Sequence, residues 1–415
     1  MPHTLQIRSR PPTDTVPSTM VVITGTAQKS ALDRGGLPPV EQVRPGTWSV
    51  PVPIPISPLR YVLVYALELA GGGIALVDAG WGTDDAWNAL RDGLALLGSA
   101  VEDVRAIVAT HVHPDHYGLA DRVRRASGAW VGLHAADAAL LGERHVHVDG
   151  LITSMGSLLE VSGVPDATLP DLSQASVQIR TLVSMAGPDV LLEHEQRIDL
   201  PGWDLRAIWT PGHSPGHVCL YSEERRLLFS GDHVLPRITP HISFHSQKVP
   251  NPLGDYLGSL ERLRELEPDE VLPAHEYRFA NLSARLTEIE RHHAARLAAI
   301  EAAIAERPGS TAWELATSLE CSRPWEEVPV FTRRAANGET LAHLVLLERR
   351  GRVRHEPGTP ARFYLVDTSP GALAAPGPRG FLAGAAVCPE PPGDSTTSAC
   401  APSAPAAPDR PGGTG

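Results

Sequence analysis

The feature that most constrains this chain is a dense group of metal-ligand side chains directly after a short apolar segment. Three histidines and one aspartate fall within six residues, in the run His111-Val112-His113-Pro114-Asp115-His116. A single buried histidine is usually a packed core residue, whereas four ligand-type side chains on one strand-to-helix loop can converge on a point. The first two histidines project to the same side of an extended backbone. The motif therefore predicts a metal site at the end of a strand.

Three further ligand-type side chains follow apolar segments in the same way. His213 comes after residues 205–209, Asp232 after residues 226–230, and His275 after residues 270–272. Loops at one edge of an α/β sheet commonly carry the functional residues of such folds. The repetition predicts one site assembled from four strand-end loops.

The surrounding sequence alternates between strand and helix patterns, which predicts a layered α/β fold. Residues 60–69 and 74–77 read as a hairpin around three consecutive glycines, and residues 84–97, 119–126 and 254–266 read as helices. The segment 151–192 interrupts this alternation. We interpret it either as a surface excursion or as a lid or wall of the substrate pocket, since it lies between two metal motifs.

Changes in composition divide the 415 residues into four parts. Residues 1–45 are polar and proline-rich and are expected to be a flexible lead-in, and residues 46–280 contain the catalytic motifs. Residues 281–367 begin with a long helix and continue as two helices and a β-ribbon, a pattern that resembles a winged helix. The Ala-, Pro- and Gly-rich residues 368–415 are expected to be disordered.

Charge and cysteine content narrow the class of protein. The net charge of −12 is spread along the chain, which argues against a mainly nucleic-acid-binding protein. The four cysteines form no CxxC pair, so neither a disulfide framework nor a cysteine metal site is expected. The N-terminal residues lack the apolar core of a secretory signal, and no apolar run reaches the ~18 residues of a membrane span. We therefore expect a cytoplasmic protein without membrane contact, and the sequence leaves its oligomeric state open.

The motifs resemble those of the metallo-β-lactamase superfamily, and within it the glyoxalase II-like hydrolases. The matching residues span about 46–280 and are Val77-Asp78-Ala79-Gly80, the 111–116 block, the loop around His213, Gly231-Asp232 and Ala274-His275. The resemblance implies an αββα sandwich with metals at one edge of two facing sheets. Here a small helical, winged-helix-like domain follows it, an addition that also occurs in some relatives.

The resemblance also implies two divalent metal positions with assigned ligands. The roles fall on His111, His113 and His213 for the first metal and on Asp115, His116 and His275 for the second, with Asp232 bridging both. Asp78 would contact these ligands without binding metal itself, and such partners orient metal ligands. Zinc is favoured, with iron or manganese as alternatives, because this histidine and aspartate set accepts each of them.

The implied activity is hydrolysis of an ester, thioester or lactone in a small-molecule acyl substrate by a metal-bridging hydroxide. Two neighbouring metals lower the pKa of bound water from about 15.7 towards 7. Asp115 is the expected catalytic residue, because it could steer the nucleophile or shuttle its proton. A metallo-thioesterase-like hydrolase is therefore the leading interpretation.

Several other functions are consistent with parts of the sequence. A two-metal ribonuclease or phosphodiesterase is the main alternative, since Arg333, Arg334, Arg349, Arg350, Arg352 and Arg354 form a modest basic cluster in the winged-helix-like region that could contact nucleic acid. Asp232 disfavours a β-lactamase, whose relatives generally lack this bridging residue, and an iron-dependent sulfur dioxygenase is a further alternative. A DNA-binding role alone would leave seven aligned ligands unexplained.

The remaining histidines carry weaker expectations. His217 and His233 each lie next to a ligand motif, and His217 in particular is expected to support the ligands. His241 and His245 follow the bridging aspartate and are expected to line the substrate pocket. Others are interpreted as structural or exposed, namely His134, His145 and His147, and no chemistry is assigned to His292 and His293.

Overall fold

Two β-sheets packed face to face form the centre of the computed structural model, which describes residues 20–55, 58–146, 148–174, 186–244, 249–319 and 324–367. Within these ranges, the side chains of residues 142–146 and 148–152 are not described. The expectations for the lead-in before residue 20, for the tail 368–415 and for His145, His147 and His245 concern residues or side chains outside this description.

The first sheet has seven strands, and its order follows the chain from β2 to β8. Its strands are β2 (Glu41–Arg44), β3 (Thr47–Pro53), β4 (Tyr61–Glu68), β5 (Ile74–Val77), β6 (Val104–Val108), β7 (Trp130–His134) and β8 (Val190–Leu192). Neighbours from β2 to β5 are antiparallel and neighbours from β5 to β8 are parallel. The hairpin predicted at residues 71–73 is confirmed as β4–β5, and all three glycines of its turn have positive φ, a conformation that glycine adopts at little cost.

The second sheet has six strands in the order β1-β13-β12-β11-β10-β9. These are β1 (Val22–Ile23), β9 (Arg206–Trp209), β10 (Val218–Ser222), β11 (Leu227–Gly231), β12 (Glu270–Pro273) and β13 (Phe279–Ala280). Strands β9 and β11 are each antiparallel to β10, and β12 is parallel to β11. The carboxyl ends of β9, β11 and β12 therefore lie at the same edge of this sheet.

Alternation of side chains along the strands builds the contact between the sheets. On β4, one alternate set of side chains faces the second sheet and the other set packs under helices. The ring of Tyr65 meets that of Phe229 edge-on across the interface, with 5.3 Å between centroids. The hydroxyls of Tyr61 and Tyr65 donate to the backbone oxygens of Glu276 and Pro273, both at 2.8 Å. These bonds tie the first sheet to the end of β12 and to the loop after it.

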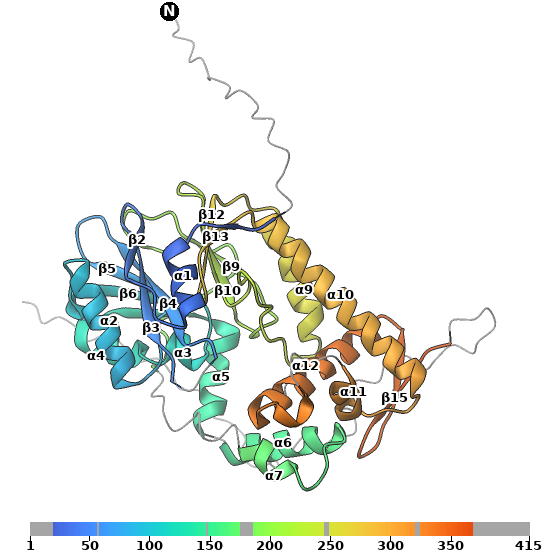
Figure 1. The fold of residues 1–415 in the computed structure, drawn as a ribbon. Helices are drawn as coiled ribbons and strands as arrows, with labels where there is room; N and C mark the ends of the chain where they lie inside the picture. The colour runs from blue at the N-terminus through green and yellow to red at the C-terminus, as the bar shows by residue number, and fades with distance from the viewer. Residues whose placement is uncertain are drawn as a thin grey trace, which may run out of the picture.

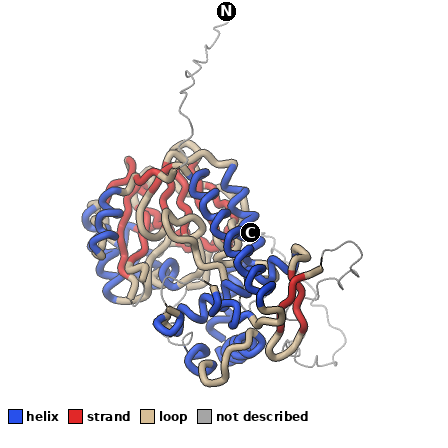
Figure 2. Tube along the Cα trace, turned by 45° about the vertical axis from the view of Figure 1, so that its right-hand side comes forward, coloured by secondary structure: helices blue, strands red, loops and turns tan. Residues whose placement is uncertain are grey.

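Helices cover the outer face of each sheet, so the main body has four layers (Figures 1 and 2). Helices α2 (Asp84–Leu96) and α4 (Ala120–Ser127) pack on the first sheet. Helices α9 (Pro252–Arg264) and α10 (Leu282–Glu306) pack on the second. The strands of the pairs β5–β6 and β11–β12 are parallel, so each pair needs a crossover connection. Helix α2 lies in the first crossover and helix α9 in the second.

The C-terminal helices share a hydrophobic core with the second sheet. Helices α11 (Ala312–Ser318) and α12 (Val330–Arg349) follow α10, and an antiparallel ribbon of β14 (Val353–Glu356) and β15 (Arg362–Leu365) comes after them. The cluster of buried side chains that contains Val271 of the sheet also contains Ile300, Leu341 and Phe363. The C-terminal segment therefore buries apolar surface of the catalytic region as well as its own.

Residues 20–45 are ordered, which corrects the expectation of a flexible lead-in for the part that the structure describes. Helix α1 (Thr26–Arg34) lies in this stretch, between strands β1 and β2. Gln28 is fully buried, donates to Ser49 Oγ at 3.0 Å and accepts from the backbone N–H of Arg278 at 2.9 Å. The polar composition suggested flexibility, but these polar groups have partners more than twenty residues away.

Within segment 151–192, the part up to residue 174 packs against the C-terminal helices. It continues α5 (Ala135–Val146) as α6 (Val148–Val161) and α7 (Leu169–Gln174), which Figure 1 shows beside α11 and α12. Trp313 donates its backbone N–H to Ser162 O at 2.9 Å, and Leu159, Val164 and Leu172 form a buried cluster with the Trp313 side chain. Towards the far end of the segment, Ala186 O accepts from the Tyr117 hydroxyl at 2.8 Å. The insert thus joins the metal motif to the C-terminal region.

The shared core predicts that the C-terminal helices and the second sheet unfold together. Leu341→Ala removes a fully buried side chain of α12 and is expected to lower the free energy of unfolding by about 2–5 kcal/mol. Urea unfolding of the full chain should keep a single transition at a lower midpoint. Thr332→Ala, at an exposed position of the same helix, should change it by at most ~0.5 kcal/mol. A separate early transition that alone responds to Leu341→Ala would contradict the shared core.

Candidate metal centre

All seven side chains expected as metal ligands come together at the edge where β6, β9, β11 and β12 end. The local sequence explains how one loop carries four of them. His113 caps α3 (Pro114–Tyr117) with an extended backbone, and Pro114 takes the first helical position, where its missing N–H costs nothing. The extended part carries His111 and His113, and the first helical turn carries Asp115 and His116. The change of backbone conformation turns the second pair towards a different point.

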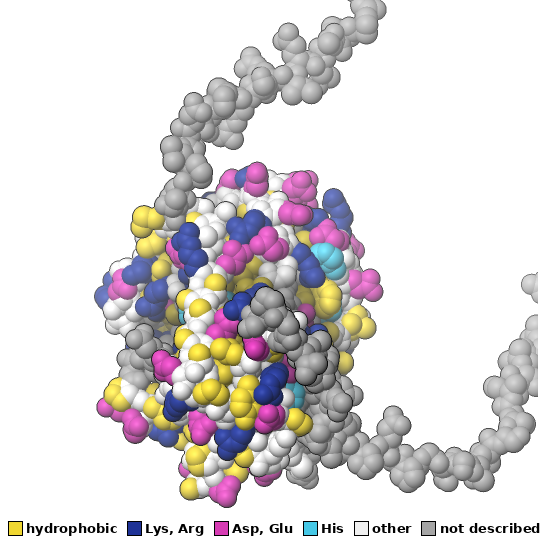
Figure 3. Space-filling view, turned by 90° about the vertical axis from the view of Figure 1, so that its right-hand side faces the viewer, with side chains coloured by type: hydrophobic (Ala, Val, Ile, Leu, Met, Phe, Trp, Pro, Cys, Tyr) yellow, Lys and Arg dark blue, Asp and Glu magenta, His cyan; other side chains and the backbone are white. Residues whose placement is uncertain are grey.

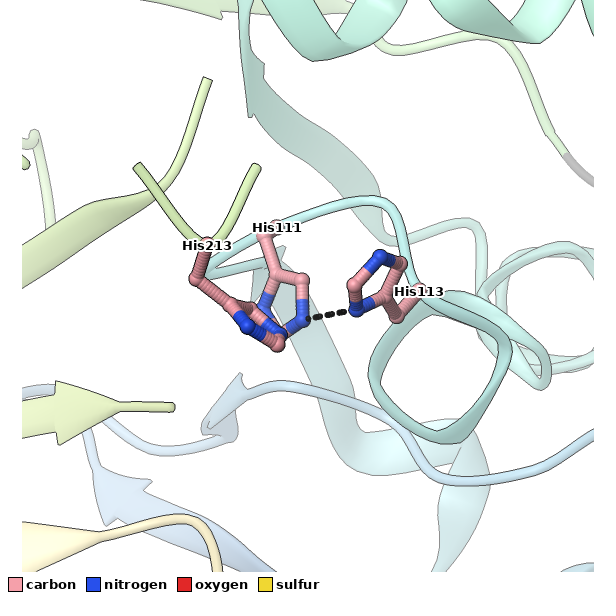
Figure 4. Close-up of side chains that lie close together, drawn as sticks. All are labelled: His111, His113 and His213. Atoms are coloured by element: carbon pink, nitrogen blue, oxygen red, sulfur yellow. Dashed lines mark hydrogen bonds between the residues drawn. The ribbon is translucent and has the colours of Figure 1, made fainter. Parts of the chain in front are cut away.

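The first group is formed by His111, His113 and His213, whose ring nitrogens lie within 4.8 Å of one another. His111 Nε2 and His113 Nδ1 are 2.9 Å apart, as the dashed line in Figure 4 shows. The ring of His213 lies 4.9 Å from that of His111 and 4.7 Å from that of His113, between centroids. Figure 4 shows the three rings converging from two separate loops. Three imidazoles in this arrangement could hold one metal ion.

A second group contains Asp115, His116 and His275. One carboxylate oxygen of Asp115 lies 3.4 Å from His275 Nε2 and 3.7 Å from His116 Nε2. The two histidines are fully buried, whereas the Asp115 side chain is 15% exposed. This group could also hold a metal ion, and Asp115 lies on its open side.

Asp232 lies between the two groups. Its Oδ2 is 3.3 Å from His213 Nε2, whereas its Oδ1 is 3.1 Å from His275 Nε2 and 3.5 Å from His116 Nε2. One carboxylate therefore faces the first group with one oxygen and the second group with the other.

Unpartnered buried atoms support a fit to metal. Among the described residues, the Nε2 atoms of His116, His213 and His275 and Oδ1 of Asp232 are buried and have no hydrogen-bond partner. Buried polar atoms without partners are costly and rare in folded proteins. All four atoms point into the same small volume. Nitrogen and carboxylate oxygen are the ligand atoms that zinc and related divalent metals take.

The opposite ring nitrogens of these histidines are held by the surrounding chain. His116 Nδ1 lies 2.8 Å from Oδ2 of Asp78, whose carboxylate also accepts from the Thr110 backbone N–H at 2.7 Å. His275 Nδ1–H donates to Tyr61 O at 2.9 Å. His213 Nδ1–H donates to His241 O at 3.0 Å. Each bond orients a ring so that its Nε2 points into the centre.

Two residues beside the ligands have different surroundings. His217 is buried, with Nδ1 2.8 Å from Thr210 Oγ1, and its Nε2 accepts from the Asp232 backbone N–H at 3.2 Å. It therefore contacts the loop that carries Asp232. His233 is buried, and its ring lies 4.7 Å from that of Tyr256 and 5.6 Å from that of His217, between centroids. Thr110, which bonds Asp78, was not identified from the sequence because a threonine before a histidine motif carries no distinctive signal.

The remaining residues singled out from the sequence lie apart from the ligands or at their rim. His241 is 39% exposed and its ring approaches Glu339 of α12 to 3.9 Å. His134 stacks on Trp209, with ring centroids 5.2 Å apart. His293 is buried on α10 with its Nδ1 3.1 Å from His343 Nε2, so it packs helices together. The structure thus places Glu339 beside His241, although the two residues are nearly one hundred positions apart in the sequence.

Charges in the centre shift the pKa values of its ligands in opposite directions. Burial opposes ionisation of Asp232, but the neighbouring His275 and His116 outweigh it, so the pKa of Asp232 lies well below its usual range. Burial likewise lowers the pKa of His275, but the carboxylates of Asp232 and Asp115 raise that pKa to about 10. The pKa of His111 falls well below normal because of burial and the adjacent His116. At neutral pH these pKa values give an ionised Asp232 beside a protonated His275 and a neutral His111.

A comparison with protein families accounts for this arrangement. The sequence model of the metallo-beta-lactamase superfamily matches residues 57–275, which include all seven ligand positions. The chain belongs to the metallo-beta-lactamase superfamily. The αββα sandwich expected from the motifs is thereby confirmed, with an additional helical region after it.

Similar proteins come from several organisms. The crystal structure of a metallo-beta-lactamase family protein of Thermus thermophilus is 33% identical and covers 78% of this chain and 100% of its own, with a TM-score of 0.68. A beta-lactamase domain protein of Burkholderia ambifaria is 25% identical over 83% of this chain and 98% of its own, with a TM-score of 0.70. "Probable metallo-hydrolase YqjP" of Bacillus subtilis is 29% identical over 55% of this chain and 70% of its own length. Each solved structure matches more of the chain than its first 280 residues, so each match includes part of the region after residue 280.

None of the described helices is long and apolar enough to cross a membrane.

The raised pKa values of two ligands make metal uptake compete with protons. His275, with a pKa of about 10, and His116, with a pKa well above normal, are protonated at neutral pH when no metal is bound. A cation at their Nε2 atoms must displace these protons, so uptake at pH 7 is expected to release about two protons per protein, with an affinity that rises with pH. Proton release into weakly buffered indicator solution measures this. His275→Gln should release about one fewer, and an uptake without any proton release would contradict the assigned protonation.

Proposed function

We propose that this protein is a dinuclear metallohydrolase that cleaves an ester, thioester or lactone bond in a small acyl substrate. The observation that carries the proposal is the Asp232 carboxylate, whose two oxygens face separate groups of histidine ligands. A carboxylate in this position suits a bridge between two cations. The resemblance of the motifs to glyoxalase II-like hydrolases supports the acyl substrate class.

We assign the first ion to His111, His113 and His213 and the second to Asp115, His116 and His275, with Asp232 shared. Zinc is proposed as the metal, with iron or manganese as alternatives that metal analysis distinguishes. When bound, two such ions would polarise a substrate carbonyl and lower the pKa of a water molecule towards about 7.

The open side of the centre suggests how substrate approaches. His113, Asp115 and His213 are partly exposed, whereas His111, His116 and His275 are buried. Substrate would therefore enter from the side of the first three residues. Burial opposes ionisation of Asp115, but the neighbouring His116 and His275 lower its pKa to about 2, so its carboxylate is charged at neutral pH. We propose that this carboxylate orients the attacking water and relays its proton.

The loop after Asp232 would form one wall of the substrate site, and the C-terminal helices hold this loop. Arg285 of α10 donates to Leu235 O at 2.6 Å and to Ile238 O at 2.8 Å. Phe244 donates its backbone N–H to Gly338 O of α12 at 2.9 Å. These contacts support a role for the C-terminal region, which we propose to be winged-helix-like, in shaping the substrate site.

At least three of the six arginines that favoured a nuclease have partners within the chain. Arg352 pairs with Glu301 at 3.0 Å, Arg354 pairs with Glu356 at 2.9 Å, and Arg349 donates to Pro250 O at 3.2 Å. On the face drawn in Figure 3, basic and acidic side chains are interspersed and the basic ones form no continuous patch. These contacts favour a structural role for the arginines over a contact with RNA phosphates.

The hydrolase proposal predicts a defined loss of activity in a panel of thioesters, lactones, aryl esters, a β-lactam and RNA. Asp115→Asn is expected to lower kcat for the cleaved acyl substrate by about 10²–10⁴-fold, because an amide cannot relay the proton. Asp232→Ala should also lower the metal content measured by elemental analysis. Asp85→Asn, at an exposed position of α2, serves as a control that leaves both readouts unchanged.

Retention of acyl hydrolysis in both the Asp115→Asn and Asp232→Ala variants would contradict this mechanism. Cleavage of RNA alone, lost when Arg349 and Arg350 are neutralised, would replace the acyl hydrolase with the nuclease alternative.

A further inference from the structure

Asp137, to which no function has been assigned above, contacts two of the loops that carry metal ligands. It lies in the first turn of α5 and is fully buried. Its Oδ2 accepts from the Val112 backbone N–H at 2.9 Å and from Ser214 Oγ at 2.8 Å, and its Oδ1 accepts from the Gly216 backbone N–H at 2.6 Å. A single carboxyl group therefore receives three hydrogen bonds from two separate loops.

The positions of these three donors relate directly to the first ligand group. Val112 stands between His111 and His113, and Ser214 directly follows His213. The two loops meet at Asp137, and their three histidines meet at the centre.

The fit around the carboxyl group is close. A Cβ on Gly216 would lie 2.5 Å from the Asp137 backbone nitrogen and 2.7 Å from its Cβ, so only glycine allows this approach. An aspartate in the first turn of a helix usually bonds or faces its own helix N-terminus. Here the side chain instead reaches across to the two loops.

We propose that Asp137 is a positioning residue that sets the geometry of the first metal position. This inference rests on the proposed two-metal function. Partners one step behind metal ligands commonly act through the ligand ring itself. Asp137 instead bonds two backbone N–H groups and one hydroxyl that lie close to the ligands in the sequence. Loss of such a partner typically costs about 10–100-fold in metal affinity. The effect should fall on the first position and spare the second.

The variant that tests this is Asp137→Asn, which keeps the size of the side chain. The asparagine amide replaces one accepting oxygen of the carboxylate with an NH₂ group, which is a donor. At least one of the three groups that donate to Asp137 would then lose its acceptor. Affinity for zinc is measured on the full chain by competition with a colorimetric chelator. His275→Ala isolates the first position and His113→Ala isolates the second, so Asp137→Asn is added to each. We expect about a 10–100-fold loss in the first background and less than about twofold in the second.

Two further variants separate positioning from general stability. Asp204 also accepts from a serine hydroxyl and a backbone N–H, those of Ser222 and Glu224, but at the opposite end of β10. Asp204→Asn should lower the melting temperature without changing zinc affinity. Ser214→Ala removes one of the three bonds to Asp137 and keeps both backbone bonds. It should give a smaller loss at the first position alone, and it tests the inference should Asp137→Asn not fold.

The outcomes distinguish this inference from the proposed function. Wild-type protein that binds two zinc ions, together with Asp137 and Ser214 variants of unchanged affinity, overturns the positioning role and leaves the proposed function standing. An equal loss in both backgrounds also overturns it, because that result indicates general destabilisation. Wild-type protein that binds fewer than two zinc ions contradicts the proposed function itself.

Discussion

The structure depends on holding unpartnered ligand atoms together in a buried space. Four ring nitrogens or carboxylate oxygens, from His116, His213, Asp232 and His275, point into one volume without hydrogen-bond partners among the described residues. Burying such groups is unfavourable in the absence of a cation, so the rest of the fold must supply their stability. The two-sheet core does so, since its bonds from Tyr61 and Tyr65 fix the end of β12 and the loop after it against the first sheet.

The same constraint explains why the ligands sit on strand ends and not within strands. A strand end leaves the next residues free to change conformation, as His113 and Pro114 do when an extended backbone becomes α3. Each histidine then needs a second contact for its other ring nitrogen, and backbone oxygens of neighbouring segments provide two of these. Tyr61 O serves His275 and His241 O serves His213. The orientation of these histidine rings thus depends on backbone oxygens that lie far from them in the sequence.

The sequence was sufficient for the sandwich and for bringing together the candidate ligands, but not for the contacts behind them. The 111–116 motif and the strand-end positions of Asp232 and His275 are local signals, because ligand type and apolar spacing appear within a few residues. Helix α1 was missed because the partners of Gln28, the residues Ser49 and Arg278, lie far along the chain. Glu339 near His241 has no local signal either. Contacts of this kind follow from topology, which spacing along one sequence does not determine.

Asp137 illustrates the difference between these two kinds of residue. In the sequence it is one acidic residue in the first turn of a helix, where aspartate is common for reasons of helix stability alone. In the folded chain its carboxyl group joins the loops of His111 and His213, because β7 leads into α5 beside both. The α5–α7 segment continues from this helix to the C-terminal helices, which hold the loop of His241. The proposed first metal position therefore depends on α5 as well as on the strand ends, and Asp137 is expected to change metal affinity without being a ligand.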